Sequence, residues 1–155
     1  MCLTTDDVYR AFYADYASHK AFLHSHSYTG NALACRAALA TLDIFRDDDV
    51  IRHNQALATR MTRATAALAD HPHVSEVRQT GMILAIELVQ DKATRTPYPG
   101  PERRGRRVYR HALEHGALLR PLGDVIYFMP PYVISEEEID FLADVACTGI
   151  DAATA

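Results

Sequence analysis

The hydrophobic pattern of the sequence changes its period near residue 74, and this change limits the folds that the chain can adopt. Between residues 31 and 70, apolar side chains recur every three or four positions, which is typical of amphipathic helices. Between residues 74 and 89, the stretch VSEVRQTGMILAIELV alternates and indicates two strands, or one strand bent at Gly81. Helices followed by strands predict an α+β layer structure with an antiparallel or mixed sheet.

The part before residue 70 predicts two long helices, or one kinked helix. The first carries Leu33, Ala37 and Phe45 on a narrow stripe, and its small residues allow close packing, so we expect this helix to be buried. The acids of Asp47–Asp49 suit the start of the second helix. Three more helices are expected: residues 4–17 behind a Thr5–Asp6 cap, residues 103–115, and a last helix from a Ser135–Glu138 capping box to about Gly149.

A β-hairpin is predicted over ALLRPLGDVIYFMPP, residues 117–131, because the turn formers proline and Gly-Asp lie between two apolar runs. If residues 121–124 form the turn, Arg120 faces Val125 and lies diagonally from Tyr127 on the same sheet face. A planar guanidinium beside a phenol can bind a carboxylate through two hydrogen bonds. The alternative is an internal ion pair between Arg120 and an aspartate or glutamate.

Composition and charge exclude several classes of function. The formal net charge is −4, so no overall positive field attracts nucleic acid, and the basic run ERRGRR is interpreted as a solvated helix start. No apolar run approaches the roughly 18 residues that a membrane span needs. The three cysteines, at positions 2, 35 and 147, are odd in number and far apart, which argues against disulfides and a zinc site. We therefore expect a cytoplasmic chain that binds neither membrane nor nucleic acid.

A cluster of small polar residues, HSHSYTGN at 24–31, precedes the first long helix. A phosphate could bind there, because a helix N-terminus presents free N–H groups and the side chain of Ser27 adds a hydroxyl donor. The alternative is that Thr29, Gly30 and Asn31 only cap the helix. The nearby histidines have no carboxylate or cysteine at ligand spacing, so no metal is expected.

Four segments together resemble the pyridoxal-phosphate-dependent class III aminotransferases. They are HSHSYTGNALACRAALATLDIF, GMILAIELV, DKATRTPYPGPERRGRRVYRHALEHG and LLRPLGDVIYFMPPYVIS. The likeness is strongest to the branch that converts 8-amino-7-oxononanoate to 7,8-diaminononanoate in biotin biosynthesis. It covers nearly the whole chain but only the C-terminal portion of such an enzyme. It implies the small domain of the aspartate-aminotransferase fold (fold type I) over residues 35–155, with a linking helix, and the tail of the large domain with an active-site loop over residues 1–34.

The resemblance also implies roles for individual residues. His26 and Ser27 would contact pyridoxal 5′-phosphate in the partner subunit of a homodimer, with the Ser27 hydroxyl on the phosphate. Ser25, Arg120 and Tyr127 would bind substrate, with Arg120 on the carboxylate of 8-amino-7-oxononanoate. Family members commonly have glycine at the position of Ser25, and many have threonine at that of Ser27.

No catalytic residue is expected in this chain. The resemblance implies a Schiff-base lysine upstream of Met1, and neither Lys20 nor Lys92 matches its position. The chain alone is therefore expected to be inactive and to need a partner subunit or an N-terminal part. Another class III aminotransferase, or a non-catalytic small domain that binds a partner chain, is the alternative. The resemblance leaves the amino donor open between S-adenosylmethionine and lysine.

Overall fold

We describe the fold from a computed structural model that describes residues 3–22 and 27–155. The chain divides into two compact units, residues 1–42 and residues 43–155. The predicted boundary between residues 34 and 35 concerns the domains of a longer enzyme and stays a prediction.

The first unit contains the helix α1 (Asp6–Phe12), a short 3-10 helix (Tyr16–Ser18) and most of α2 (Ala32–Asp47). α1 is shorter than the predicted helix over residues 4–17, because none of its residues is buried and so short a helix gains little from its own hydrogen bonds. Thr5 occupies the N-cap position, but its side chain makes no capping hydrogen bond.

The family resemblance implies that α2 packs against a large domain and a second subunit, so we expect it to be exposed in the chain alone, and none of its described residues is buried. Leu33 is 83% exposed and Leu42 is 64% exposed. The apolar stripe is present. Phe45 near its C-terminal end is half-buried, with its ring centroid 5.8 Å from that of Tyr132, whereas Leu33 and Leu42 are exposed. Such a stripe is typical of a surface that packs against another chain or domain.

We therefore expect the isolated chain to self-associate. Light scattering at micromolar concentration should give an apparent mass above the 17.3 kDa of one chain. Replacing Leu33 and Leu42 by glutamine should lower that mass, because both side chains are exposed apolar groups of α2. A monodisperse species of one chain mass in the unmodified protein would contradict the expectation.

The second unit begins with α3 (Val50–Ala64), so residues 31–70 form two long helices and not one kinked helix. Asp48 and Asp49 separate α2 from α3, and Asp49 has a left-handed backbone with φ of 48°. Few residues other than glycine, asparagine and aspartate adopt this conformation readily. The aspartates predicted to start the second helix thus form the break between the two helices.

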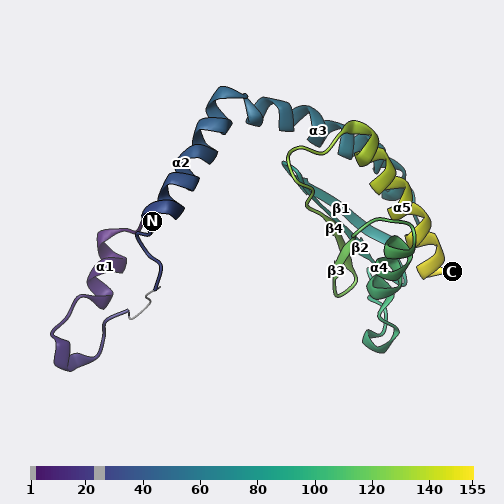
Figure 1. The fold of residues 1–155 in the computed structure, drawn as a ribbon. Coiled ribbons are helices and arrows are strands. Elements are labelled where there is room, and N and C mark those ends of the chain that lie inside the picture. Colours follow the sequence, from purple (N-terminus) through teal and green to yellow (C-terminus); the bar gives the residue numbers. More distant parts are fainter. Residues whose placement is uncertain (1–2, 23–26) are drawn as a thin grey trace. The chain divides into compact units, whose positions relative to one another are not determined.

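In the part of the chain that the structure describes, four antiparallel strands form a single sheet in the order β1-β2-β4-β3 (Figure 1). The strands are β1 (Val74–Thr80), β2 (Ile83–Leu88), β3 (Arg120–Leu122) and β4 (Val125–Phe128). β1 and β2 are two strands joined at Gly81, whose φ of +54° suits the turn. The predicted α+β class with an antiparallel sheet is confirmed.

One face of the sheet shares a core with α3, α4 (Arg104–Glu114) and α5 (Glu136–Thr154). Alternate strand residues such as Leu84, Ile86 and Ile126 are at most 1% exposed, as the period of two predicts. α5 packs against both α3 and α4. On the other face, Glu76, Arg78 and Tyr127 are exposed or half-buried, so this face is open in the described part of the chain.

The last helix, α5, begins where it was predicted to begin but ends later than predicted. Ser135 and Glu138 form the capping box, with each side chain bonded to the backbone N–H of the other at 3.2 and 2.9 Å. The helix continues past Gly149 to Thr154. Gly149 is an interior residue where α5 meets α4, since an added Cβ would lie 3.1 Å from the His111 ring.

The hairpin register also differs from the prediction. The turn contains only Gly123 and Asp124, and Arg120 lies directly opposite Tyr127 instead of Val125. Gly123 supplies a φ of +63°, as a two-residue turn requires. Pro121 was assigned to the turn but belongs to β3, where it is tolerated because β3 is an edge strand.

Candidate active site

Arg120 and Tyr127 lie in one row across the open face of the sheet. The cross-strand pairs are Arg78 with Ala85, Ala85 with Tyr127, and Tyr127 with Arg120. Residues paired in this way project from the same face, with Cβ atoms about 5 Å apart. The prediction that Arg120 and Tyr127 share a face is therefore confirmed, and the two are direct neighbours and not diagonal ones.

The two arginines of this row differ in their partners. Arg78 bonds Glu87 at 2.9 Å and Glu76 at 3.3 Å. Arg120 is exposed and has neither an ion pair nor a side-chain hydrogen bond within the part of the chain that the structure describes. The predicted alternative, an internal ion pair of Arg120, is absent from those residues. Arg120 thus presents a free guanidinium beside the half-buried Tyr127.

The polar cluster before α2 lies only partly in the described residues. Of the predicted cofactor and substrate residues, Ser25 and His26 lie outside them, and Ser27 is exposed in a turn over residues 27–30. Asn31 caps α2, because its Oδ1 accepts a hydrogen bond from the Ala34 N–H at 3.0 Å. The cap is thus made by Asn31, and the side chain of Ser27 is exposed before the helix.

The two lysines are placed differently. Lys92 is half-buried, and its Nζ donates hydrogen bonds to the carbonyl oxygens of Ala69 and, at 3.3 Å, His71. These bonds tie the loop after β2 to the end of the preceding helical segment, which is a structural role. Lys20 is exposed and lies in the other unit.

The described cysteines and histidines do not form a metal centre. Within residues 3–22 and 27–155, no group of three or more His, Cys, Asp or Glu side chains could hold a metal ion. Cys35 and Cys147 are free thiols, and burial raises the pKa of the Cys147 thiol. A raised pKa disfavours the reactive thiolate. No helix in the described residues is long and apolar enough to cross a membrane.

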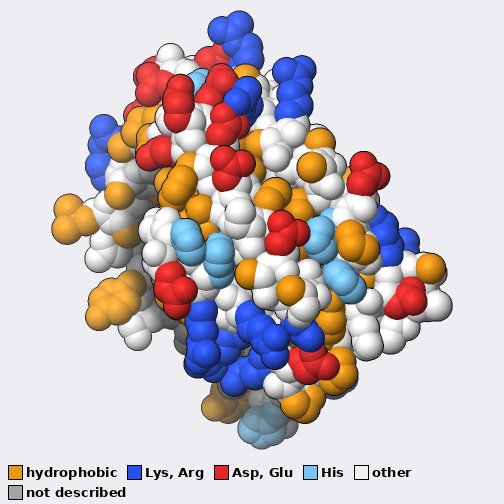
Figure 2. Space-filling view, turned by 90° about the vertical axis from the view of Figure 1, so that its right-hand side faces the viewer, with side chains coloured by type: hydrophobic (Ala, Val, Ile, Leu, Met, Phe, Trp, Pro, Cys, Tyr) orange, Lys and Arg blue, Asp and Glu red, His pale blue; other side chains and the backbone are white. Residues whose placement is uncertain are grey.

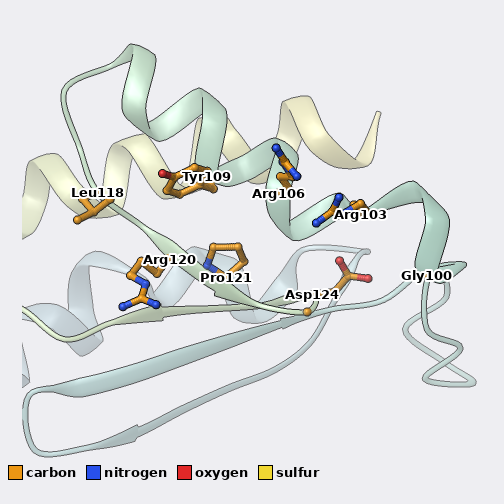
Figure 3. A pocket seen from close by; sticks show the side chains of 9 residues that line it. Gly100, Arg103, Arg106, Tyr109, Leu118, Arg120, Pro121 and Asp124 are labelled. Atoms are coloured by element: carbon orange, nitrogen blue, oxygen red, sulfur yellow. The ribbon is translucent and has the colours of Figure 1, made fainter.

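A pocket between α4 and the β3–β4 hairpin was not predicted. It has a volume of about 520 Å³, and its lining includes Arg103, Arg106, Tyr109 and Arg120 (Figure 3). The signal in the sequence was the run ERRGRR, which was interpreted as a solvated helix start. Only the contact between α4 and the hairpin brings these arginines to the same pocket as Arg120.

The start of α4 is held by contacts that the sequence did not predict either. The Gly105 N–H donates to Asp124 Oδ1 at 2.8 Å, so an aspartate of the hairpin turn caps the helix. Arg104 bonds Glu102 at 2.7 Å and the Ala153 carbonyl, and it lies over the buried Tyr98 ring at 4.8 Å. Arg104 is therefore the structural arginine of the run.

Comparison with known proteins places this antiparallel α+β domain, with its open sheet face and exposed arginine, in a family of enzymes. The family model described as aminotransferase class-III matches residues 1–147, and the chain belongs to this family, whose members are pyridoxal-phosphate-dependent enzymes. Among curated relatives, the chain is similar to the adenosylmethionine-8-amino-7-oxononanoate aminotransferase of Anoxybacillus flavithermus, with 47% identity over 138 residues. That alignment covers 89% of this chain and 30% of the relative. The enzyme of the same name from Geobacter sulfurreducens is 46% identical over 142 residues, 92% of this chain and 31% of the relative.

Solved structures agree with this assignment. The crystal structure of adenosylmethionine-8-amino-7-oxononanoate aminotransferase from Methanocaldococcus jannaschii matches with a TM-score of 0.81 and 41% identity, over 98% of this chain and 35% of that one. The omega transaminase from Pseudomonas jessenii in complex with PMP matches with a TM-score of 0.78 and 29% identity, over 89% of this chain and 30% of that one. The chain therefore has the fold of part of a fold type I transaminase, and it spans about 30% of the length of the curated relatives.

Proposed function

We propose that this chain supplies the C-terminal part of an aminotransferase that converts 8-amino-7-oxononanoate to 7,8-diaminononanoate in biotin biosynthesis. The names of the relatives support this substrate, and they include adenosylmethionine, which we propose as the amino donor. The identity of 41–47% extends over most of the chain.

One observation carries the proposal, namely the free guanidinium of Arg120 opposite Tyr127 on the open sheet face. A guanidinium binds a carboxylate through two parallel hydrogen bonds, which positions an elongated substrate by one end. Tyr127 beside it offers a hydroxyl donor and an apolar ring. Together they would hold the carboxylate of 8-amino-7-oxononanoate, while the amino donor would use other contacts.

The polar cluster before α2 would serve the cofactor and the substrate. Pyridoxal 5′-phosphate supplies the electron sink for transamination when it is bound. The exposed Ser27 hydroxyl would donate to its phosphate, and His26 would adjoin it, in the site of the partner subunit of a homodimer. Ser25 would border the substrate. The helix that begins at Ala32 would add the favourable potential of its N-terminus to the same phosphate.

The test is the replacement of Arg120 by alanine in a full-length enzyme that carries this segment. The KM for 8-amino-7-oxononanoate should rise by about 30- to 100-fold, as expected for the loss of a charge-assisted bidentate contact. The KM for the amino donor should change less than about threefold. Arg120→Lys should recover part of the loss, because it restores the charge but not the planar fork.

Arg78→Ala is the matched control, since Arg78 lies in the same row of the sheet but already binds Glu87 and Glu76. It should leave both KM values nearly unchanged. If Arg120→Ala raised the KM of both substrates equally, the assignment of Arg120 to the oxononanoate carboxylate would be wrong.

A further inference from the structure

A group of arginines at the start of α4 has no role in the proposed transamination. Five of the 14 arginines of the chain lie at positions 103–110. Arg104 is paired with Glu102, but Arg103, Arg106, Arg107 and Arg110 are exposed and have no side-chain hydrogen bond or ion pair among the described residues. Figure 2 looks onto the side on which α4 lies in Figure 1, and basic side chains gather in its lower part.

Two adjacent pockets bring these side chains together. The pocket between α4 and the hairpin, of about 520 Å³, and a smaller one of about 240 Å³ along α4 share Arg103 and Arg106. The smaller pocket also has Arg107 and Arg110 in its lining. The four arginines therefore line two adjoining pockets, in a chain whose overall charge is negative.

The nearby carboxylates are already engaged. Asp124 lines the larger pocket, but its Oδ1 accepts the N–H of Gly105 at 2.8 Å. Glu102 lines the smaller pocket and bonds Arg104 at 2.7 Å. Four like charges in one place repel each other, and a bound anion would relieve that repulsion. The arrangement thus favours an external anion.

The lining and the volume of the larger pocket indicate which class of anion it can bind. Arg103 and Arg106 project from the start of α4, and Tyr109 lies farther along the helix, near Leu118 and Pro121 of the hairpin side (Figure 3). Guanidinium groups bind phosphoryl oxygens in bidentate fashion, and an aromatic ring stacks on a flat ring system. A volume of about 520 Å³ is in the range of small-molecule sites and exceeds what a phosphate alone would fill.

We propose that this pocket binds a phosphorylated small molecule of nucleotide size, with its phosphates on Arg103 and Arg106 and its ring against Tyr109. The pocket also contains Arg120, but the three residues proposed to bind this ligand take no part in the proposed transamination. The variants below leave Arg120 intact, so that failure of one proposal does not affect the other.

Equilibrium dialysis of the 155-residue chain against ATP, pyrophosphate and adenosine tests the proposal, and it tolerates self-association. ATP should bind with a Kd below about 1 mM, and adenosine should not bind measurably. The double variant Arg103→Gln/Arg106→Gln should weaken ATP and pyrophosphate at least about tenfold, as for the loss of a charge-assisted hydrogen bond. Tyr109→Leu should weaken ATP but not pyrophosphate.

The matched control is Arg10→Gln/Arg63→Gln, which removes the same charge from two exposed arginines outside the pocket. It should leave ATP binding within about twofold of the unmodified chain, and circular dichroism should show that all variants keep their helices. Equal weakening by the control would overturn the proposal, because the binding would then follow net charge. So would an absence of ATP binding, or tighter binding of a single-stranded oligonucleotide or heparin than of ATP.

Discussion

Replacing Gly105 with alanine is expected to destabilise the chain by about 3–5 kcal/mol, enough to unfold a marginally stable domain. An added Cβ at Gly105 would lie 2.2 Å from the carbonyl oxygen of Gly123 and 3.0 Å from the Pro121 Cβ. The oxygen belongs to the backbone of the hairpin turn and cannot rotate away. Moving α4 from the turn would also break the bond from the Gly105 N–H to Asp124.

Gly100→Ala is the control for this prediction. Gly100 has no atom within 4 Å of an added Cβ and no positive φ, so alanine should change the free energy of unfolding by less than about 1 kcal/mol. Urea unfolding followed by circular dichroism would compare the two midpoints. Similar midpoints for both variants would show that α4 and the hairpin do not approach as closely as described.

The isolated chain is expected to show no transaminase activity and to form no stoichiometric Schiff base with pyridoxal phosphate. Its two lysines do not match the position of the family lysine, and the Nζ of Lys92 is already bonded to two backbone carbonyl oxygens. A Schiff base there would need a neutral amine released from both bonds. Absorption spectra, followed by borohydride reduction and intact-mass measurement, would detect any bound cofactor.

Two further samples sharpen this measurement. Co-expression with the N-terminal part of a relative should restore both the absorption band and the activity, if the chain supplies the C-terminal part of the enzyme. Lys92→Ala and Lys20→Ala should leave the spectrum of the isolated chain unchanged. One cofactor per chain, lost on either substitution, would instead place a catalytic lysine within these residues.

Much of the local structure followed from the sequence because short-range physics decides it. The alternation over residues 74–89 predicted two strands, or one strand bent at Gly81, and the structure has the two strands. The Ser135–Glu138 pair predicted the start of α5. A capping box joins side chains to backbone groups three residues away, and alternation along a strand places every second side chain on one face. Neither depends on a distant part of the chain. The placement of Arg120 and Tyr127 on one face followed from the same period, whereas the sequence left open whether Arg120 forms an internal ion pair.

The predictions were wrong at positions where contact with a distant segment of the chain determines the local structure. Gly149 was interpreted as a helix end, but it lies inside α5 because α4 packs against it. Pro121 was placed in the turn, but it is a strand residue because β3 is the edge of the sheet and needs no N–H donor there. Glycine suits both a helix end and a closely packed helix interior, and proline suits both a turn and an edge strand. In each case a tertiary contact decided which of the two structures formed.

The sequence by itself determined the class of fold, its family likeness and the two neighbouring groups, Arg120 and Tyr127, that suit a carboxylate. Only the tertiary structure decided that Arg120 and Tyr127 pair directly, and that Asp124 caps α4 through Gly105. It alone also brought Arg103 and Arg106 into the pocket that contains Arg120. The physical reason is that periodicity and caps act over a few residues, whereas register and helix-to-hairpin contacts depend on segments far apart in the chain.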